Sequence, residues 1–532
     1  MSQSSQSKFL RSAFAALLLC SSLGVAAQSP QPELVIGLST PVTSLDPHFH
    51  NLGPNNAVAK HVFETLVKMD EAQRLQPGLA ESWKAVDPTT WEFKLRKGVK
   101  WHDGSEFTAD DVVATFNRIP KVPNSPASFV TYTKPIVSAT AVDKHTLRIK
   151  TERPHPLVPN DLVSVHIVPK KLADSAKTED FNAGRAMVGT GPYKLVEYVA
   201  GDRIVLAPNP AYWGKKPDFG NVRFKMIPNG AARVAALLAG DVQMIADVPT
   251  ADHAQLSKDA RVSLASAVSN RVIYIHMDSD RDKSPFVTDK AGKPLDKNPL
   301  KDARVRKALS KAIDRNAIVS RIMEGQAQAA GQLLPEIFFG TSRALPVEKF
   351  DPEGAKKLLA EAGYPQGFGL TLHAPNNRYI NDEKIAQAIA QYLTRAGIAT
   401  KIETMPSSVF FSRAGKLEFS ALLAGWGAET GENSSPLRAL VTSFDPKAGS
   451  GAANRGRFSD AGVDAVVQTA VSTIDDPKRA LMLAAASEKA IGEQQAVIPV
   501  HYEVSTWGMK KGLAYKARAD QYTLASEVSK AK

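Results

Sequence analysis

The stretch LTLHAPNNRYINDEKIAQAIAQYLTRAGIATKIE, residues 370–403, contains a short apolar segment, a polar loop, an amphipathic segment and a second apolar segment. Leu370–His373 has the apolar character of a buried strand. Apolar residues recur at helical spacing over Ile380–Ala396, and this pattern predicts a helix that ends at Gly397. A second strand is expected over Ile398–Glu403. Strands that alternate with helices are typical of a mostly parallel sheet covered by helices, so this half of the chain is expected to be α/β.

The first half of the chain contains more strands and fewer helices. Leu34–Leu38 is expected to be a buried strand, and Trp91–Arg96 alternates apolar and polar residues as a half-exposed strand does. Thr108 and Asp111 have the spacing of a capping box, which predicts a helix beginning there. Further strands are expected at Thr146–Lys150, Ser164–Val168, Tyr193–Tyr198, Arg203–Ala207, Val222–Ile227 and Arg271–Met277. The first half is therefore expected to be α+β in style.

Length and composition restrict the class of protein. The chain has 532 residues, which is several times the size of an ordinary domain, so at least two lobes with cores of their own are expected. The hydrophobic fraction of 43% and charged fraction of 23% are those of a globular protein. The net charge of +12 comes from scattered residues without interleaved aromatics, so a nucleic-acid partner is not expected.

The N-terminus has the pattern of a secretory signal peptide. Lys8 and Arg11 precede an apolar run over Phe14–Val25, and small residues follow at Ala26 and Ala27. Residues 1–27 are therefore predicted to be removed, which places the mature protein in the periplasm. An alternative is a lipoprotein anchored at Cys20, the single cysteine of the chain. The bulky Leu19 before it argues against lipid modification, which prefers a small residue there.

Sequence signatures of catalysis are absent. The chain contains no G-x-S-x-G, no H-E-x-x-H and no G-x-x-x-x-G-K-[ST] motif, and the mature chain has no thiol. A secreted hydrolase therefore lacks a visible nucleophile and base. His48, His50 and His61 could serve a metal-scavenging or haem-scavenging protein only if they converged in a cleft. The absence of a catalytic constellation favours binding over catalysis.

Many short motifs follow one another in a fixed order along the chain. They are Ser44–Pro47, Phe63–Val67, Leu79–Trp83, Phe93–Gly104, Thr108–Val112, Gly189–Tyr193, Asn209–Gly214, Val305–Leu309 and Ile313–Arg315. Together they resemble the family 5 extracellular solute-binding proteins, which serve the peptide/nickel class of ABC importers. The resemblance depends on the number and order of the motifs, because each of them alone is weak.

This resemblance implies an α/β, two-lobed periplasmic-binding-protein fold of class II, with an extra subdomain in the first lobe and the ligand in the cleft between the lobes. The first lobe would comprise residues 28–269 and a C-terminal return over 505–532, and the second lobe residues 270–504. The protein would be a monomer that captures a peptide or a peptide-like solute. It would deliver this solute to an inner-membrane permease driven by a separate ATPase. Neither enzymatic activity nor a cofactor is expected.

Several site residues follow from the same resemblance. Relatives that bind free peptides hold the α-amine with an Asp three residues after a Trp, where this chain departs from the pattern with Glu429 after Trp426 and Gly427, a side chain longer by one methylene. Trp426 would form an apolar wall of the pocket. The run Thr430–Glu432 also resembles the loop of glutathione-binding relatives, so glutathione or another modified peptide is an alternative ligand. A buried ammonium requires a carboxylate partner, which explains the need for an acid here.

The remaining site residues lie in two other loops. Arg378 and Tyr379 would hold the C-terminal carboxylate of a peptide, since a guanidinium can bind a carboxylate through two parallel hydrogen bonds. The alternative for Arg378 is an ion pair with a nearby acid of its own loop. The first lobe would contribute His48, Asn51 and Gly53, where the glycine lets the backbone approach a ligand.

Overall fold

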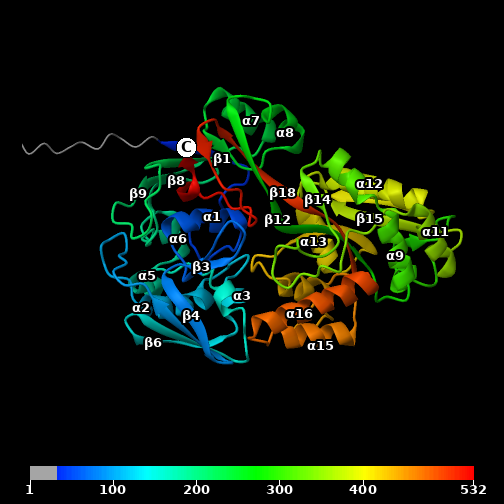
Figure 1. Ribbon diagram of the computed structural model, residues 1–532, viewed down its shortest axis with the longest axis horizontal. Coiled ribbons are helices and arrows are strands. Elements are labelled where there is room, and N and C mark those ends of the chain that lie inside the picture. Colours follow the sequence, from blue (N-terminus) through cyan, green and yellow to red (C-terminus); the bar gives the residue numbers. More distant parts are fainter. Residues whose placement is uncertain (1–32, 532) are drawn as a thin grey trace, which may run out of the picture.

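The computed structural model describes residues 33–531, so the expected signal peptide and Cys20 lie outside the described residues. Two lobes lie side by side and share a pair of long antiparallel strands, β12 (Val262–Met277) and β18 (Val497–Lys510) (Figure 1). None of the helices within residues 33–531 combines the length and the apolar character that a membrane crossing requires.

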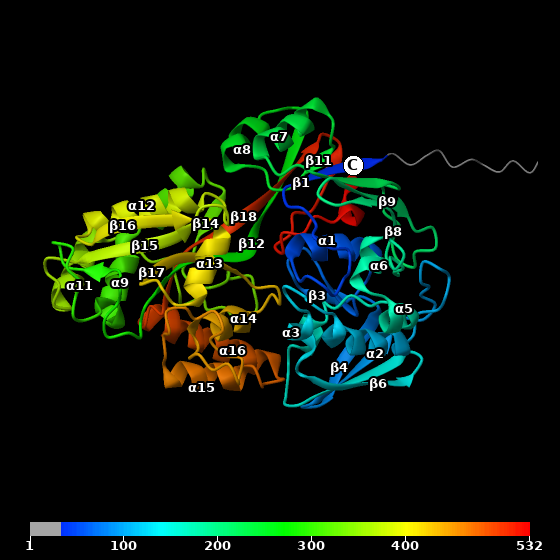
Figure 2. The ribbon, with the colours of Figure 1, turned by 180° about the vertical axis from the view of Figure 1, so that it is seen from behind.

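The shared strands change register where they pass from one lobe to the other. Val268 pairs with Val504, but the next pair is Val272 with Tyr502. The residues between these pairs do not continue the ladder, and the two strands join the sheets of both lobes at this irregularity (Figure 2). A register shift of this kind bends a strand pair and increases its local twist.

The second lobe has a mixed sheet. Strands β15 (Gly369–Pro375), β16 (Ala399–Met405) and β17 (Ala421–Gly427) are parallel, as the sequence predicts. The expectation of a mostly parallel sheet fails beyond them, because β12 pairs antiparallel with both β17 and β18. The short strands β13 (Val287–Thr288) and β14 (Ala327–Ala329) are antiparallel to β15 and β18.

Helices cover both faces of this sheet. On one face, the core contains residues of α9 (Ala303–Ala312), α11 (Pro352–Glu361) and α12 (Asp382–Arg395). On the other face it contains residues of α13 (Ser407–Gly415), α15 (Ala461–Ala470) and α16 (Asp476–Ser487). Alternate residues of β12 face the two cores, with Ile273 in the first and Tyr274 in the second. Burial on both faces explains why these strands have nearly continuous apolar runs.

The first lobe combines parallel and antiparallel pairs. Strand β1 (Leu34–Leu38) is parallel to β10 (Val222–Met226) and to β11 (Met244–Ile245). Strands β9 (Arg203–Pro208) and β8 (Tyr193–Val199) continue the sheet as an antiparallel meander. Its helices include α1 (Gly53–Val62), α5 (Lys170–Ser175), α6 (Thr178–Asn182), α7 (Gly230–Ala239) and α8 (Thr250–Leu256).

A second sheet forms the expected extra subdomain of this lobe. Its strands β4 (Ala80–Asp87), β5 (Thr90–Leu95), β7 (Thr146–Thr151) and β6 (Ile136–Asp143) are all antiparallel and lie in that order. Helix α2 (Ala109–Arg118) begins at the predicted capping box, where the Thr108 amide donates to the Asp111 carboxylate at 2.8 Å. The subdomain has its own apolar core, which includes Trp91, Phe93 and Val112.

The predicted strand at Ser164–Val168 is wrong. This segment is buried, and the Ile167 amide donates to the Glu64 carbonyl, but only His166 forms a bridge, with Thr65. Its apolar character reflects its place in the core of the subdomain rather than a position in a sheet. Periodicity alone does not distinguish these two cases for a short apolar run.

The first core also contains the C-terminal segment of the chain. Trp507, Tyr515 and Val528 pack in the same apolar cluster as Leu34 of β1. The chain therefore returns to the first lobe after it has completed the second, and its last residues become available to line a site in the first lobe.

Gly189 provides a test of how tightly this lobe is packed around α1. A Cβ atom at this position would lie 1.8 Å from the Val62 carbonyl oxygen at the end of the helix. We expect Gly189→Ala to lower the free energy of unfolding by about 3 kcal/mol or more, since backbone atoms have to move. Urea titration measures this change.

The control is Gly415→Ala at the end of α13, where an added Cβ meets no atom within 4 Å. It should change stability by less than about 1 kcal/mol. Equal stability of the two variants would contradict the close approach of Gly189 to α1.

Candidate functional site

A cavity of about 350 Å³ lies in the first lobe and is capped by one residue of the second. Its walls come from the last turn of α1, from strand β2 (Val67–Met69) and the turn after it, from residues 212–215, and from the C-terminal residues 518–527. Glu429, which follows β17 in the second lobe, closes the remaining side. Segments that are distant from one another in the sequence therefore line one cavity.

The loop that carries Glu429 is held against the first lobe by its backbone. The Gln73 side-chain amide donates to the Glu429 carbonyl at 3.2 Å, and the Asn160 side-chain amide donates to the Thr430 carbonyl at 2.8 Å. Gly431 has a φ of 66° and lies against Gln73, where a Cβ would be 3.1 Å from the Gln73 carbonyl oxygen. A glycine is suited to this close, left-handed position.

The Glu429 carboxylate lacks a cationic partner. Its Oε2 accepts a hydrogen bond from the Tyr522 hydroxyl at 3.2 Å, and Glu429 takes part in none of the ion pairs formed by residues 33–531. Burial raises the pKa of Glu429 above its ordinary value, although the positive charge of Arg271 opposes this shift. The cavity thus contains an acid that a bound cation would stabilise in its charged form.

Lys60 is a cation in the cavity lining that neighbours the same tyrosine. Its ammonium donates to the Val163 carbonyl at 3.0 Å and lies 5.8 Å from the centre of the Tyr522 ring. Burial lowers the pKa of Lys60 to about 8. Like Glu429, Lys60 takes part in none of the ion pairs within the described part of the chain.

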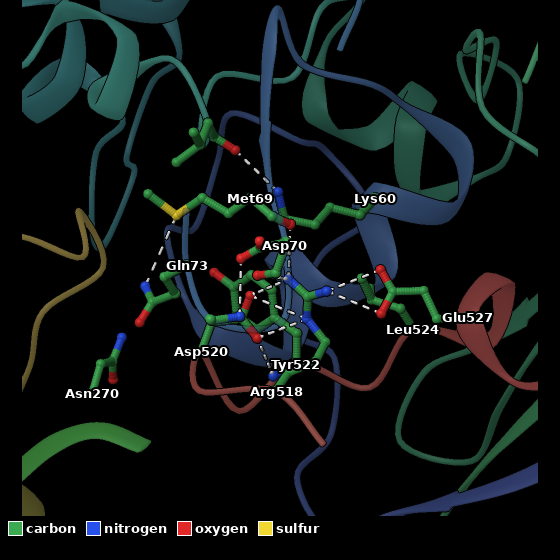
Figure 3. A network of polar contacts seen from close by, with 12 residues as sticks. Lys60, Met69, Asp70, Gln73, Asn270, Arg518, Asp520, Tyr522, Leu524 and Glu527 are labelled. Carbon is green, nitrogen blue, oxygen red and sulfur yellow. Dashed lines mark hydrogen bonds and ion pairs between the residues drawn. The ribbon is translucent and has the colours of Figure 1, made fainter. Parts of the chain in front are cut away.

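The other charges that line the C-terminal wall neutralise one another. Arg518 binds the Asp520 carboxylate through two hydrogen bonds, of 2.6 and 3.0 Å, and the Glu527 carboxylate through two of 2.9 Å (Figure 3). Burial disfavours the charged form, but these two carboxylates raise the pKa of Arg518 above its ordinary value. Arg518 also donates to the Met69 and Asp70 carbonyls, which fixes the C-terminal segment against β2.

Glu64 is neutralised in a similar way on the adjoining wall. Lys68 forms an ion pair with it at 2.6 Å, and the Tyr212 hydroxyl and the Trp213 indole donate to it at 3.0 and 2.6 Å. The Thr190 hydroxyl adds a bond of 2.9 Å. Three of the sequence motifs, around Glu64, Thr190 and Tyr212, therefore meet at one buried carboxylate.

Comparison with known proteins identifies the chain. The family model of the bacterial extracellular solute-binding proteins, family 5, matches residues 74–447. The chain belongs to this family. The predicted resemblance is thereby confirmed, and with it the α/β, two-lobed binding-protein fold.

Relatives with assigned ligands are distant but match over most of their length. The dipeptide-binding protein of Escherichia coli is 29% identical over 80% of this chain and 81% of its own length. A glutathione-binding protein of Shigella flexneri is 28% identical over 93% of both chains. The solved structure of HbpA2 from Haemophilus parasuis is 25% identical, with a TM-score of 0.80 over 94% of this chain and 100% of that one.

Of the predicted site residues in the second lobe of this family 5 protein, Glu429 lines the cavity and its neighbours do not. Trp426 is half-buried against the second core, and its indole donates to the Ser435 hydroxyl at 3.2 Å. Gly427 pairs with Arg271 of β12, and a Cβ there would lie 3.1 Å from the guanidinium. Both residues support the strand that presents Glu429.

Asn51 and Gly53 lie beside the cavity rather than in its wall. The Asn51 side-chain amide donates to the Tyr132 hydroxyl at 3.0 Å. Gly53 is the first residue of α1, and a Cβ there would lie 3.9 Å from the Tyr522 ring. The two residues therefore contact aromatic side chains near Glu429.

His48 is removed from the cavity, and its expected contact with a ligand is replaced by a structural role. It is fully buried, its Nε2 lies 2.7 Å from the His166 carbonyl, and its Nδ1 lies 2.8 Å from the Arg118 guanidinium. Arg118 also forms a buried ion pair with Asp46 at 2.7 Å. Both ring nitrogens of His48 thus have protein partners, which leaves neither for a solute.

Arg378 and Tyr379 follow β15 in the second lobe and do not line the cavity. Tyr379 is buried and donates to the Gly425 carbonyl at 3.2 Å. The Arg378 guanidinium is exposed and lies 5.1 Å from the centre of the Tyr379 ring. The nearby acid Asp382 accepts the backbone amides of Arg378 and Tyr379, so the expected alternative of a guanidinium–carboxylate pair does not form.

Sequence reasoning missed Lys60, Tyr522 and the Arg518 network. Lys60 stands in an otherwise apolar helical run, which was a usable signal, since a lysine among buried residues requires a partner. Nothing local marks Tyr522, because it acquires its role through the return of the chain to the first lobe.

The histidines do not converge. His61 is fully buried, with Nδ1 2.9 Å from the Ala57 carbonyl and Nε2 accepting the Ala525 amide at 2.8 Å. His50 instead contacts the Thr43 hydroxyl. Within residues 33–531, no group of three or more His, Cys, Asp and Glu residues is arranged to hold a metal ion.

The buried histidines predict acid sensitivity. Burial lowers the pKa of His48 and of His61 to about 4, and that of His276 and His501 to about 3, from 6.5. Between pH 6.5 and 4 the unfolded chain therefore binds more protons than the folded one, and stability falls as the pH falls. Urea titrations from pH 7 to pH 4.5 should show a loss approaching about 1.4 kcal/mol per pH unit for each such histidine. Constant stability over this range would contradict their burial as neutral groups.

Proposed function

We propose that this family 5 protein captures a small peptide or a peptide-like solute with a free ammonium group and delivers it to the permease of an ABC importer. The permease would be driven by a separate ATPase. Family membership supports a solute-binding role, and the relatives include proteins named for dipeptide and glutathione binding. The cavity supports a ligand that is small and charged.

The half-buried carboxylate of Glu429, which has no ion-pair partner among residues 33–531, is the observation that carries this proposal. An acid removed from water without a cation is unfavourable, and a ligand ammonium would supply the missing charge. Because the neighbouring Tyr522 hydroxyl already accounts for one lone pair, the carboxylate retains acceptor sites that face the cavity. The site thus favours amine-bearing ligands over neutral ones.

The register shift in β12 and β18 supports a hinge at this point. We place the first lobe at residues 28–269 and 505–532 and the second at 270–504. The chain then passes from one lobe to the other twice, once in β12 and once in β18, and both points lie beside the register shift. Glu429 belongs to the second lobe and most of the cavity wall to the first, so a rotation here would open and close the site. Hinge closure of this kind is a common mode of solute capture.

The export signal is part of the same proposal. Residues 1–27 would direct the chain to the periplasm and be removed, and lipid attachment at Cys20 is the less favoured alternative. The protein would act there as a monomer.

A hydrolase and a metal or haem scavenger receive less support. Histidine is absent from the described cavity lining, so Ser164 and Ser526 have no neighbouring imidazole base in it. His48 and His61 are both committed to buried hydrogen bonds.

Glu429→Gln tests the proposed function. The variant keeps the size of the side chain and a hydrogen-bonding group for Tyr522 but removes the charge. We expect it to weaken the binding of an amine-bearing dipeptide by roughly 30-fold or more, the effect of removing one partner of a buried charge pair. Isothermal titration calorimetry with free and N-acetylated dipeptides measures the difference.

The acetylated peptides are the control, because they lack the ammonium and should bind wild type and variant alike. A matched control variant is Glu353→Gln on α11, an exposed acid in the second lobe. An unchanged affinity of Glu429→Gln for free peptides would contradict the amine-binding role.

A further inference from the structure

Lys60 and Glu429 are two half-buried charges of opposite sign that line one cavity, and neither has an ion-pair partner among residues 33–531. Four other charged residues of the lining, Glu64, Arg518, Asp520 and Glu527, belong to ion pairs. Lys60 and Glu429 take part in none of the pairs within residues 33–531, and each has one neutral hydrogen-bond partner. A ligand that complements this cavity therefore has to supply both a cation and an anion.

The two groups are close enough to act on one small part of a ligand. Tyr522 is a neighbour of both groups, since its hydroxyl donates to Glu429 at 3.2 Å and its ring centre is 5.8 Å from the Lys60 ammonium. Lys60 and Tyr522 both line the cavity beside the C-terminal segment (Figure 3). A head group with an ammonium and a carboxylate on the same carbon would offer each of the two residues an opposite charge within this one cavity.

We propose that Lys60 binds a carboxylate that the ligand carries beside its ammonium, so that the cavity selects a zwitterionic α-amino-acid head group, such as that of a γ-glutamyl-linked peptide. This inference depends on the proposed function, because it assigns the ligand ammonium to Glu429. It adds an anion-binding residue in the first lobe that is separate from Arg378, which does not line the cavity.

The chemistry of the peptide linkage decides between ligand classes. In an ordinary α-linked peptide, the carbon that carries the ammonium also carries an amide, which offers Lys60 no charge. In a γ-linked glutamyl peptide, that carbon carries a free carboxylate. Lys60 would then gain a charge-assisted partner in place of a neutral carbonyl, and such bonds are the stronger ones.

Burial explains why this partner matters. The Lys60 side chain contributes a buried ammonium whose pKa is lowered to about 8, which reflects incomplete compensation of its charge. The negative charges of Asp520 and Glu429 favour the ammonium, whereas Arg518 and Lys68 oppose it. A ligand ammonium would engage Glu429, and a ligand carboxylate would then meet a cation that forms no ion pair with the described residues.

A pair of isomeric ligands tests the proposal. γ-Glu-Ala and α-Glu-Ala have the same composition and the same net charge and differ only in which carboxyl group of the glutamate forms the peptide bond. Titration calorimetry with the whole mature protein should give a roughly 30-fold preference for γ-Glu-Ala. Lys60→Gln, which retains a donor for the Val163 carbonyl, should remove this preference by weakening γ-Glu-Ala alone.

Lys215→Gln is the matched control, because it removes the same charge from an exposed position at the rim of the cavity. It should leave the preference unchanged. Lys60→Arg retains the charge and should retain the preference, and a loss of the preference in this charge-conserving variant would contradict the proposal.

The outcomes separate this inference from the proposed function. If wild type binds both isomers equally, and Glu429→Gln weakens both, the protein is an amine-dependent peptide binder and the role of Lys60 is overturned. If neither isomer nor any other amine-bearing peptide binds, the proposed function itself fails. A preference for γ-Glu-Ala that survives in Lys60→Gln would also overturn the inference.

Discussion

The two strands that the lobes share are the constraint on which the rest of the structure depends. Strands β12 and β18 pair with each other on both sides of the register shift and take part in the sheets of both lobes. Each lobe completes its own core around its half of this pair, with Met509 and Trp507 in the first and Ile275 and Ile498 in the second. The proposed hinge lies in this shared pair, where bending would change the position of Glu429 relative to the first lobe and leave each core intact.

Charge compensation then determines the chemistry of the cavity. Buried ion pairs lock the C-terminal segment and the family motifs in place, through Arg518 on one wall and Glu64 on the other. Removing either partner of such a pair is strongly destabilising, so these groups act as structural elements. Lys60 and Glu429 differ because their charges are held by the fold without being neutralised by it. Structural and ligand-directed charges thus lie side by side, and their pairing distinguishes them.

Sequence reasoning succeeded where the signal is local. The capping box at Thr108, the apolar periodicity of α12 and the Gly397 that follows this helix all depend on neighbours within a turn or two. It failed where burial comes from distant parts of the chain. Ser164–Val168 is apolar because a domain core surrounds it, and the first half of β12 pairs with a strand more than 200 residues away.

The candidate site divides in the same way. Glu429 was predicted because it follows a tryptophan in a recognisable motif, and Glu429 lines the cavity. His48 belongs to a comparable motif, but its neighbours Arg118 and His166 come from elsewhere in the fold and occupy both of its nitrogens. Lys60 and Tyr522 are 462 positions apart in the printed sequence and meet only because the chain returns to the first lobe. Contacts of this kind require tertiary structure and cannot be derived from spacing.

The distance between the lobes in solution tests the central claim most directly. Because Cys20 is the single cysteine of the chain, a mature protein beginning at Gln28 can carry spin labels at two introduced cysteines alone. Suitable positions are Lys144 in the first lobe and Lys478 on α16 in the second, both exposed. A hinge at β12 and β18 predicts that saturating γ-Glu-Ala shifts the distance distribution measured by double electron–electron resonance to a shorter and narrower range. An identical distribution with and without bound ligand, under conditions where calorimetry records binding, would contradict it.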